Sequence, residues 1–368
     1  MYKLFTSESV ASGHPDKICD QVSDAIVDAA LRLDSKSHVA VETLVTTNRL
    51  ILAGEITTKG KIDYETIARK VIKDLGYTDP HLGFSDQSEI EVYIHQQSSE
   101  IAAGVEKNGA GDQGMMFGYA NSETKQLMPT PITLAHELVR QLDHLRKDKK
   151  LPYLLPDGKS EVTVKYDGLK PVSVERVVLA VAHQSKIGQK ELRDDLYKLL
   201  ITTTLAEFGF KIAEKNVIVN GAGPWTTPGP ASDTGLTGRK IVIDTYGGFA
   251  RAGGGAFSGK DPTKVDRSGA YAARYLAKNI VATGLASHVE VQVAYVIGVA
   301  EPVAKAIETF GTEKKPLKQI ESYAWELLNL SVPEILAKLD LRRPVYQRTA
   351  AYGHFGQEDF SWEKVASI

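Results

Sequence analysis

Cysteine is nearly absent from this sequence, because Cys19 is the only one among its 368 residues. A single thiol cannot form an internal disulfide, so the chain does not depend on a disulfide framework and fits a reducing compartment. Cys19 lies within a helix-like pattern, which favours a packed, small apolar side chain over a reactive thiol.

Long apolar runs and an excess of one charge are also lacking. The most apolar run, 291–300, contains Gln292 and is far shorter than the roughly 20 residues of a membrane-spanning helix. The opening MYKLFTSESV has neither the basic lead nor the apolar stretch of a secretory signal. With 44 basic and 46 acidic residues, the net charge of −2 gives no general attraction to nucleic acid, so an anion site has to be built locally. We expect a soluble, cytoplasmic protein.

Helical and strand patterns alternate along the chain, which predicts a mixture of α and β structure. Helical periodicity occurs in 18–33, 64–76, 133–147, 190–209 and 271–284. Segments rich in β-branched residues predict strands at 38–47, 49–57, 91–98, 161–167, 174–183, 239–246 and 288–300. A Ser-His-Val triplet follows a predicted helix twice, at 37–39 and 287–289, so repeated α/β units are plausible.

The length predicts two or three domains, and two segments rich in turn-forming residues suggest the junctions. These segments are 100–114 and 220–238. The predicted division is an N-terminal domain at 1–100, a linking segment at 101–114, a central domain at 115–231 and a C-terminal domain at 232–368. The linking segment could equally be a mobile loop over a site.

A glycine-rich loop at 253–268 has the spacing of a phosphate-binding loop. Gly254–Lys260 fits the G-x-x-x-x-G-K pattern, but Asp261 stands where the Ser or Thr that holds magnesium is required. We expect a strand before the loop and a helix after it, with Asp261 as the helix cap and Pro262 in the first turn. Lys260, Lys264 and Arg267 would then lie near the phosphates, with Asp266 as a metal candidate. The alternative is a glycine-rich turn before a solvated basic helix end.

A second group, GHPDKICDQVSD at 13–24, places His14 and Asp16 at the start of a helix. His14 can donate a hydrogen bond to a phosphate or protonate a leaving oxygen. Asp16 is either a helix cap or a magnesium ligand. Asp20, Asp24 and Asp28 continue one helical stripe at four-residue spacing, which usually marks a solvated face.

A third group contains Asp233, Arg239 and Lys240 around a turn that leads into the predicted strand at 239–246. Adjacent cations at such an edge are usually surface residues. Glu42 and Glu55 lie within otherwise apolar strands, so they either pair with cations in the interior or face solvent.

Taken together, the chain resembles the S-adenosylmethionine synthetase family. The resemblance rests on His14 with Asp16, the GAGDQG motif at 109–114 and the GGGAFSGKD motif at 253–261, and it extends to TAAYGHFG near the end. It implies an α+β fold of three similar α/β domains in a pseudo-threefold arrangement, with sheets used for subunit packing. It also implies that the sulfur of L-methionine attacks the 5′ carbon of ATP, and that the released triphosphate is hydrolysed to pyrophosphate and phosphate. No covalent nucleophile is needed or evident.

The same resemblance implies the site residues. Catalytic roles fall to His14, Lys159, Arg239 and Lys260. ATP would be bound by His14, Asp157, Gly158, Lys159, Trp225, Asp233, Arg239, Lys240, Ala256 and Lys260. L-Methionine would be bound by Glu55, Gln97, Asp112, Asp233 and Lys264. Two Mg²⁺ ions per site would be held by Asp16 and Asp266, and K⁺ by Glu42. The loop at 97–106 would gate entry, and the active sites would lie between the subunits of a homodimer or homotetramer.

One segment departs from the family pattern. Members commonly carry an Arg-Phe pair in a GRFVIGGP-like stretch that helps to hold ATP, whereas this chain has GPWTTPGP, with Pro224 and Trp225 at those positions. Trp225 could stack on adenine, but Pro224 cannot replace an arginine.

Two alternatives follow from the same residues. A P-loop kinase would transfer a phosphoryl group to a hydroxyl, but Asp261 removes the metal-holding hydroxyl and no Walker B pattern follows. A non-catalytic nucleotide-sensing subunit would not require the retained His14, Asp16, Lys159, Lys260 and Asp266.

Overall fold

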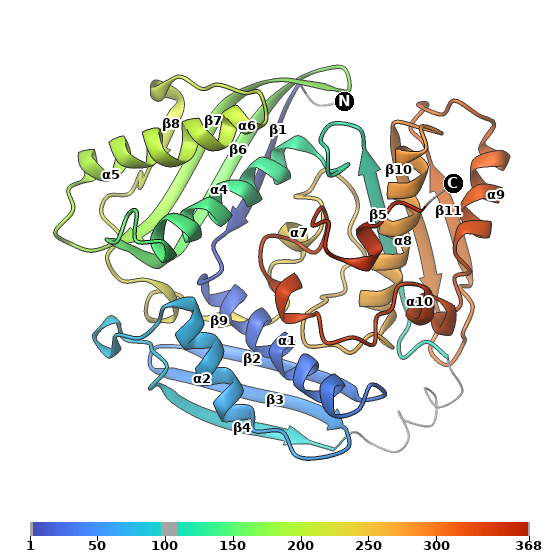
Figure 1. Cartoon of the computed structure of the whole chain (residues 1–368), viewed down its shortest axis with the longest axis horizontal. Coiled ribbons are helices and arrows are strands. Elements are labelled where there is room, and N and C mark those ends of the chain that lie inside the picture. The colour runs from blue at the N-terminus through green and yellow to red at the C-terminus, as the bar shows by residue number, and fades with distance from the viewer. Residues whose placement is uncertain (1–2, 97–108, 367–368) are drawn as a thin grey trace.

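The strands form three separate sheets within the part of the chain that the structure describes (Figure 1). It is a computed structural model that describes residues 3–96 and 109–366. Long helices pack on the sheets and lie toward the middle of the molecule in Figure 1 around the short helix α7. They are α1 (Pro15–Leu33), α4 (Thr130–Lys147) and α8 (Val265–Ala282), and α7 spans Ile241–Asp244. The predicted α+β class is confirmed.

The first sheet has the strand order β4-β3-β2-β9. Its strands are β2 (His38–Thr46), β3 (Arg49–Thr57), β4 (Glu89–His95) and β9 (Gly235–Leu236). Alternate residues of β2, such as Val39 and Val41, are buried against helices. Glu42, which follows Val41, faces the other way and is exposed. Helix α2 (Tyr64–Leu75) packs on α1, so one face of the sheet is covered by helices.

The second sheet has the order β1-β6-β7-β8, and the third has β11-β10-β5. The second contains β1 (Leu4–Val10), β6 (Leu154–Asp167), β7 (Lys170–His183) and β8 (Val217–Val219). The third contains β5 (Gly114–Asn121), β10 (His288–Tyr295) and β11 (Ala304–Glu308). Shorter helices are α5 (Gln189–Asp195), η2 (Leu196–Ile201), α6 (Thr202–Glu207), α9 (Leu317–Leu327) and α10 (Val332–Lys338).

Each sheet takes one strand from a distant part of the chain. β1, which opens the chain, pairs with β6 in the second sheet, from Leu4 opposite Lys165 to Val10 opposite Lys159. β5 pairs with β10, and β9 pairs with β2. The sheets therefore join strands across both predicted junctions, and the division of the chain at those junctions stays a prediction.

Most predicted elements are present, and the repeated Ser-His-Val triplet does lie between a helix and a strand each time, α1 to β2 and α8 to β10. The predicted strand at 239–246 is wrong, because this segment forms the short helix α7. The adjacent residues Ile243 and Asp244 are both buried, whereas Val242 is exposed. Burial therefore does not alternate from residue to residue as it would in a strand.

The predicted helix start at Asp261 and Pro262 is also wrong. Helix α8 begins at Val265, after Lys264. The Asp261 carboxylate instead accepts hydrogen bonds from the backbone N–H groups of Thr263 at 2.9 Å and Val39 at 2.7 Å. It therefore ties the turn before the helix to β2 rather than capping α8.

Candidate active site

The start of α1 is where three distant parts of the chain meet. Gly13 lies so close to the start of β6 that a Cβ atom would be 1.9 Å from the carbonyl oxygen of Pro156. Gly235 in β9 approaches α1 equally closely, because a Cβ there would be 2.3 Å from the carbonyl carbon of Pro15. Only glycine permits these approaches, which bring β6 and β9 onto the helix start.

His14 is the N-cap of α1 and is almost fully buried. Its Nδ1 accepts the backbone N–H of Asp16 at 3.2 Å, so the neutral ring carries its proton on Nε2. Burial, together with Lys240 and Lys159, lowers the pKa of His14 to about 3. The imidazole is therefore neutral at physiological pH and is a hydrogen-bond donor through Nε2.

Asp16 connects α1 to the turn that carries the predicted cations. Its Oδ1 accepts the backbone N–H of Leu236 at 2.9 Å, its Oδ2 accepts from Lys240 Nζ, and Arg239 Nε lies 3.6 Å from Oδ1. Although burial opposes ionisation, the hydrogen bonds from Lys240 and Leu236 hold the pKa of Asp16 below its ordinary value. His14, Asp16, Arg239 and Lys240 thus form one cluster, although Arg239 and Lys240 do not enter a strand as predicted.

The start of β6 adds Asp157, Gly158 and Lys159 to this cluster. The Gly158 carbonyl accepts the backbone N–H of Ala11 at 2.8 Å, and exposed Lys159 is close enough to His14 to lower its pKa. Asp157 is buried, and desolvation raises its pKa to about 7. One of its oxygens accepts the N–H of Gly229 at 2.8 Å, while Oδ1 has no partner among the described residues.

The glycine-rich loop lies along the edge of β2 opposite β3, beyond the short pairing of that edge with β9. Lys260 forms a β-bridge with Ala40, and Gly259 O accepts the N–H of Val41 at 2.9 Å. Lys260 Nζ is 2.6 Å from Asp266 Oδ2. A Cβ at Gly255 would be 2.2 Å from the Asp266 carboxyl carbon, so the loop folds directly over this carboxylate.

Glu42 and Glu55 lie on the outward face of the first sheet, which settles the open alternative in favour of exposure in the single chain. Ala40 is opposite Glu55 and Ala53 is opposite Glu42, so both carboxylates point to the same side. Neighbouring protein atoms nevertheless raise the pKa of Glu42 to about 7 by desolvation, more than the charge of Lys260 lowers it.

The remaining predicted residues are less closely connected. Ala256 packs against Gly238, where a Cβ would be 2.6 Å from the Ala256 Cβ. Asp112 and Asp233 are exposed, and Lys264 pairs with Asp261. Trp225 is half-buried, and its Nε1 donates to the carbonyl of Thr227 at 2.7 Å. Gln97 and the loop at 97–106 lie outside the described residues.

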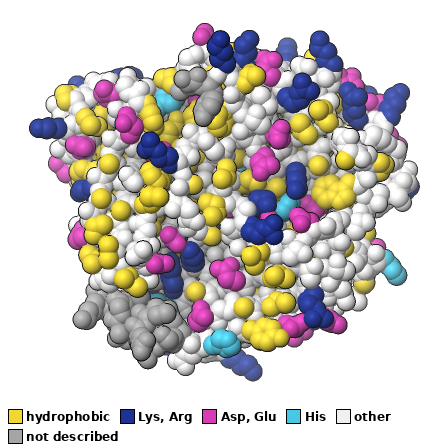
Figure 2. Space-filling model, turned by 180° about the vertical axis from the view of Figure 1, so that it is seen from behind, with side chains coloured by type: hydrophobic (Ala, Val, Ile, Leu, Met, Phe, Trp, Pro, Cys, Tyr) yellow, Lys and Arg dark blue, Asp and Glu magenta, His cyan; other side chains and the backbone are white. Residues whose placement is uncertain are grey.

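Charged side chains of both signs gather on one face of the molecule, as Figure 2 shows to the right of centre, with apolar side chains around them. Arg267 does not contribute to this surface, contrary to the prediction. It is fully buried and forms a two-pronged ion pair with Asp24, with both N–O distances at 2.8 Å.

The prediction that Asp20, Asp24 and Asp28 form a solvated face is wrong as well, because all three are buried. Sequence reasoning missed the cations that pair with two of them, Lys17 with Asp20 and Arg267 with Asp24, which are also fully buried. Lys17 bonds to both Asp20 and Asp244, and although burial alone would lower its pKa, these carboxylates raise it. The sequence signal for these cations was the acidic stripe itself. Four carboxylates in one line, counting Asp16, need nearby positive charges or hydrogen-bond donors when they are buried.

No cluster of three or more His, Cys, Asp or Glu side chains suited to hold a metal occurs in residues 3–96 and 109–366. Asp16 and Asp266 are single carboxylates, each beside a lysine. This donor set fits Mg²⁺, which is commonly held by one or two carboxylates together with substrate phosphates and water. Glu42, an oxygen ligand without a hydrogen-bond partner of its own among the described residues, fits a hard cation such as K⁺.

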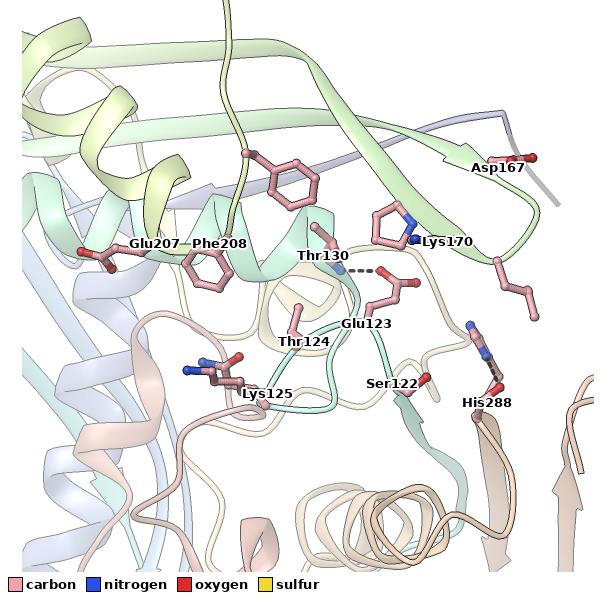
Figure 3. A pocket seen from close by; sticks show the side chains of 15 residues that line it. Ser122, Glu123, Thr124, Lys125, Thr130, Asp167, Lys170, Glu207, Phe208 and His288 are labelled. Atoms are coloured by element: carbon pink, nitrogen blue, oxygen red, sulfur yellow. Dashed lines mark hydrogen bonds between the residues drawn. The ribbon is translucent and has the colours of Figure 1, made fainter. Parts of the chain in front are cut away.

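A large cavity lies elsewhere and contains none of the predicted site residues. It measures about 860 Å³ and is lined by the loop after β5, the β6–β7 turn, the end of α6 and the start of β10 (Figure 3). Glu123, one of its acidic residues, already accepts from Thr130 N and Tyr166 Oη, while Lys125 and Lys170 are exposed. Catalytic groups do not converge there.

Comparison with known proteins gives the same family along the whole chain. Three domain models match, described as S-adenosylmethionine synthetase N-terminal domain at 2–99, central domain at 107–225 and C-terminal domain at 227–364. The chain belongs to the S-adenosylmethionine synthetase family. The family predicted from sequence is confirmed, and with it an enzyme of this type.

Individual relatives agree with the family assignment. The S-adenosylmethionine synthase of Treponema denticola is 50% identical, over 98% of this chain and 95% of its own. That of Mesoplasma florum is 48% identical, over 100% and 99%, and that of Salinibacter ruber is 50% identical, over 100% and 97%. These comparisons do not support the kinase or the non-catalytic subunit. Among the described residues, no helix is long and apolar enough to cross a membrane.

Proposed function

We propose that the chain transfers the adenosyl group of ATP to the sulfur of L-methionine at the cluster around the start of α1. The sulfur forms a bond with the 5′ carbon of ATP, and the bond from that carbon to the triphosphate oxygen breaks with its electron pair leaving on the triphosphate. A water molecule then cleaves the triphosphate into pyrophosphate and phosphate. The observation that carries this proposal is the convergence of His14, Asp16, Arg239 and Lys240 beside Lys159.

The cluster suits a departing polyanion. The leaving triphosphate carries about four negative charges, and fixed cations aimed at such a group lower the barrier because they need no reorganisation during the reaction. Lys240 and Lys260 are each held beside a carboxylate in the free protein. We infer that the triphosphate becomes their partner on binding, with Arg239 and Lys159 along it.

His14 would act as a neutral donor to the triphosphate. Its Nδ1 is occupied by the backbone of Asp16, so only Nε2–H is available. With a pKa of about 3, the ring is already uncharged at neutral pH and has no acidic proton to give up there. It stabilises developing negative charge on the leaving oxygen by hydrogen bonding rather than as an imidazolium.

The metal assignments remain proposals that rest on the donor types. Mg²⁺, when bound, neutralises charge on the phosphate oxygens. Asp16 and Asp266 would hold it, and Glu42 would hold K⁺. Lys240 and Lys260, which pair with these two aspartates, would then bind the triphosphate.

The residues that we propose for binding adenosine and methionine are those that the family resemblance implies. Asp157, with one oxygen unpartnered and a pKa of about 7, is a buried group able to bond to ATP, together with Gly158, Trp225, Asp233 and Ala256. Methionine would lie near Glu55, Asp112, Asp233 and Lys264, with Gln97 outside the described residues. Orienting the neutral sulfur in line with the 5′ carbon supplies the rest of the rate enhancement.

We also infer that two copies meet through the outward sheet faces, as a homodimer or a homotetramer. Glu42 and Glu55 lie on the outward face of the first sheet, and Lys159 points outward from the second. Exposed apolar residues also lie on the sheets, with Tyr93 on β4 of the first sheet and Met115 on β5 of the third. A partner covering these faces would exclude water from the site. The cytoplasmic location stays a prediction.

The reaction is tested by incubating the protein with ATP, L-methionine, Mg²⁺ and K⁺ and analysing the products by mass spectrometry. We expect a sulfonium product together with pyrophosphate and phosphate, and no phosphate release without methionine. Formation of ADP would instead indicate a kinase.

The role of Lys260 is tested by Lys260→Met, which removes one cation from the proposed triphosphate site. We expect turnover to fall by at least about 100-fold, the usual effect of removing one charge-stabilising group, with the thermal midpoint retained. Lys70→Met is the matched control, because Lys70 also pairs with an aspartate, Asp74, but on the exposed surface of α2. Near-normal turnover of Lys260→Met would contradict the proposed site.

A further inference from the structure

The four aspartates of α1 are buried in a line, and each accepts a backbone hydrogen bond from a distant part of the chain. Asp16, Asp20, Asp24 and Asp28 follow at four-residue spacing, which places one carboxylate about every 6 Å along the helix. Each accepts a backbone N–H from a segment at least 218 residues further along the chain. We call these four residues the aspartate row.

Two members of the row hold the residues directly before the proposed catalytic cations. Asp20 Oδ1 accepts the N–H of Gly238 at 2.9 Å, and Gly238 precedes Arg239. Asp24 Oδ1 accepts the N–H of Gly259 at 2.9 Å, and Gly259 precedes Lys260.

Both glycines have a backbone conformation that side chains rarely adopt, with φ of 80° at Gly238 and 82° at Gly259. The N–H of each glycine bonds to α1, and the side chain of the next residue contacts a carboxylate of the proposed site. Fixing the glycine N–H therefore fixes where the next side chain begins.

Buried cations hold the two carboxylates in place. Lys17 Nζ is 2.9 Å from Asp20 Oδ2, and Arg267 binds both oxygens of Asp24. Arg267 also donates to the carbonyl of Lys260 at 3.0 Å. Lys260 is thus held on both sides, through the N–H of the residue before it and through its own carbonyl.

We propose that Asp20 and Asp24 are positioning residues that set the places of Arg239 and Lys260 along α1, so that both cations meet one triphosphate. The proposal rests on the function proposed above for these two cations. The two aspartates do not touch the substrate. They act through backbone hydrogen bonds to the glycines.

The row supplies its own control in Asp28. Asp28 accepts the N–H groups of Tyr346 at 2.8 Å and Gln347 at 3.1 Å, one on each oxygen, but these residues precede no proposed site residue. Asp20, Asp24 and Asp28 are all buried and accept hydrogen bonds on both oxygens. Replacement by Asn keeps the shape and removes one acceptor in each case. At Asp20 and Asp24 it also leaves a buried cation short of one negative charge, a loss that the thermal midpoint reports separately from turnover.

The experiment compares Asp20→Asn, Asp24→Asn and Asp28→Asn by turnover and by thermal midpoint. Turnover is followed as accumulation of the sulfonium product over hours, so that slow variants remain measurable. We expect the first two to lose about 10- to 100-fold in kcat, since a displacement of about 1 Å can cost 100-fold, and Asp28→Asn to stay within about threefold. Equal losses in all three, or normal kcat in Asp24→Asn, would overturn the proposal, as would failure of both Asp20→Asn and Asp24→Asn to fold.

A double-mutant cycle shows whether Asp24 acts through Lys260. If it does, adding Asp24→Asn to Lys260→Met lowers turnover by less than about threefold further, because the positioned group is already gone. Multiplied losses would overturn the proposal. Retained turnover in Lys260→Met alone would instead overturn the proposed function of Lys260, so the two failures are distinguishable.

Discussion

At the scale of single residues, Trp225 is the clearest departure from the family pattern. By the resemblance described above, it stands at the phenylalanine of an Arg-Phe pair. The hydrogen bond from its Nε1 to Thr227 O fixes the ring while leaving it half-exposed. A fixed aromatic face of this kind can stack on a base, which is worth about 1–3 kcal/mol.

Replacing Trp225 by Ala should therefore raise the Michaelis constant for ATP, by roughly tenfold for a loss of about 1.4 kcal/mol. The Michaelis constant for methionine should not change, because the indole is not placed near that substrate. Trp225→Phe is the control that keeps an aromatic face, and it should behave like the parent. An unchanged constant for ATP in Trp225→Ala would rule out stacking.

Asp28 gives a pH dependence of stability. Burial raises its pKa to about 6, against an ordinary value of 3.8. The folded state binds this proton more tightly than the unfolded state, so the contribution is fully present below pH 3.8 and is lost as pH rises through about 6. A shift of this size corresponds to about 3 kcal/mol.

We expect the thermal midpoint of Asp28→Asn, relative to the parent, to rise between pH 4 and pH 7 and then level off, because asparagine does not titrate. Taking the difference between the two proteins removes the effect of other buried acids. A difference that stays constant across this range would show that Asp28 does not carry a raised pKa.

The residues near the start of α1 could be predicted because their chemistry is local. His14, Asp16 and the two cations at 239–240 each appear in short motifs, and the structure brings these four together. The burial of Asp20 and Asp24 could not be predicted from helical spacing. Their partners, Arg267 and the backbone of Gly238 and Gly259, come from segments whose approach to α1 only the tertiary structure establishes.

At the scale of elements, the glycine-rich loop is shaped by its contact with β2. Gly254 and Gly259 have similar φ values, 89° and 82°, but different surroundings. A Cβ at Gly254 would meet open space, whereas one at Gly259 would be 2.0 Å from the carbonyl oxygen of Val41. Substitutions at these two glycines therefore separate the energetic cost of the backbone conformation from the cost of the close approach to β2.

Gly254→Ala should cost about 1–2 kcal/mol, the usual penalty for a side chain in this conformation. Gly259→Ala should cost clearly more, because the loop must also move away from β2. The measurement is the free energy of unfolding in denaturant for both variants. Equal losses would mean that the approach to β2 is not tight.

Elements with strong periodicity were predicted correctly, but two that depend on tertiary contacts were not. Segment 239–246 has strand-like composition and yet forms α7, because Lys240 is drawn to Asp16 and Asp244 to Lys17. Asp261 is of a residue type that often caps helices, but its carboxylate accepts the backbone N–H of Val39 in the neighbouring strand. In both cases a buried ion pair or hydrogen bond outweighs local propensity.

At the scale of the whole molecule, each sheet contains a strand from a distant part of the chain. We therefore expect that the three matched regions do not fold on their own. The matched central region, 107–225, contains β6 but not β1, which covers its edge. Helix α4 packs on both strands, so the fragment would leave apolar surface and backbone groups unpaired.

We expect the 107–225 fragment to show no cooperative thermal transition by circular dichroism, whereas the full chain does. Adding a peptide of residues 3–12, which contains β1, should increase the strand signal of the fragment. A cooperative transition of the fragment without the peptide would contradict this interdependence.

The pairing of β9 and Lys260 with β2 also has a consequence for synthesis. When the ribosome has released the first hundred residues, the sheet they belong to still lacks the segments that close its edge at Leu44 and Ala40. Those segments emerge only after more than half of the chain has been translated, so the nascent protein cannot mature one domain at a time. Completion of the proposed triphosphate site and completion of the first sheet are therefore the same late event.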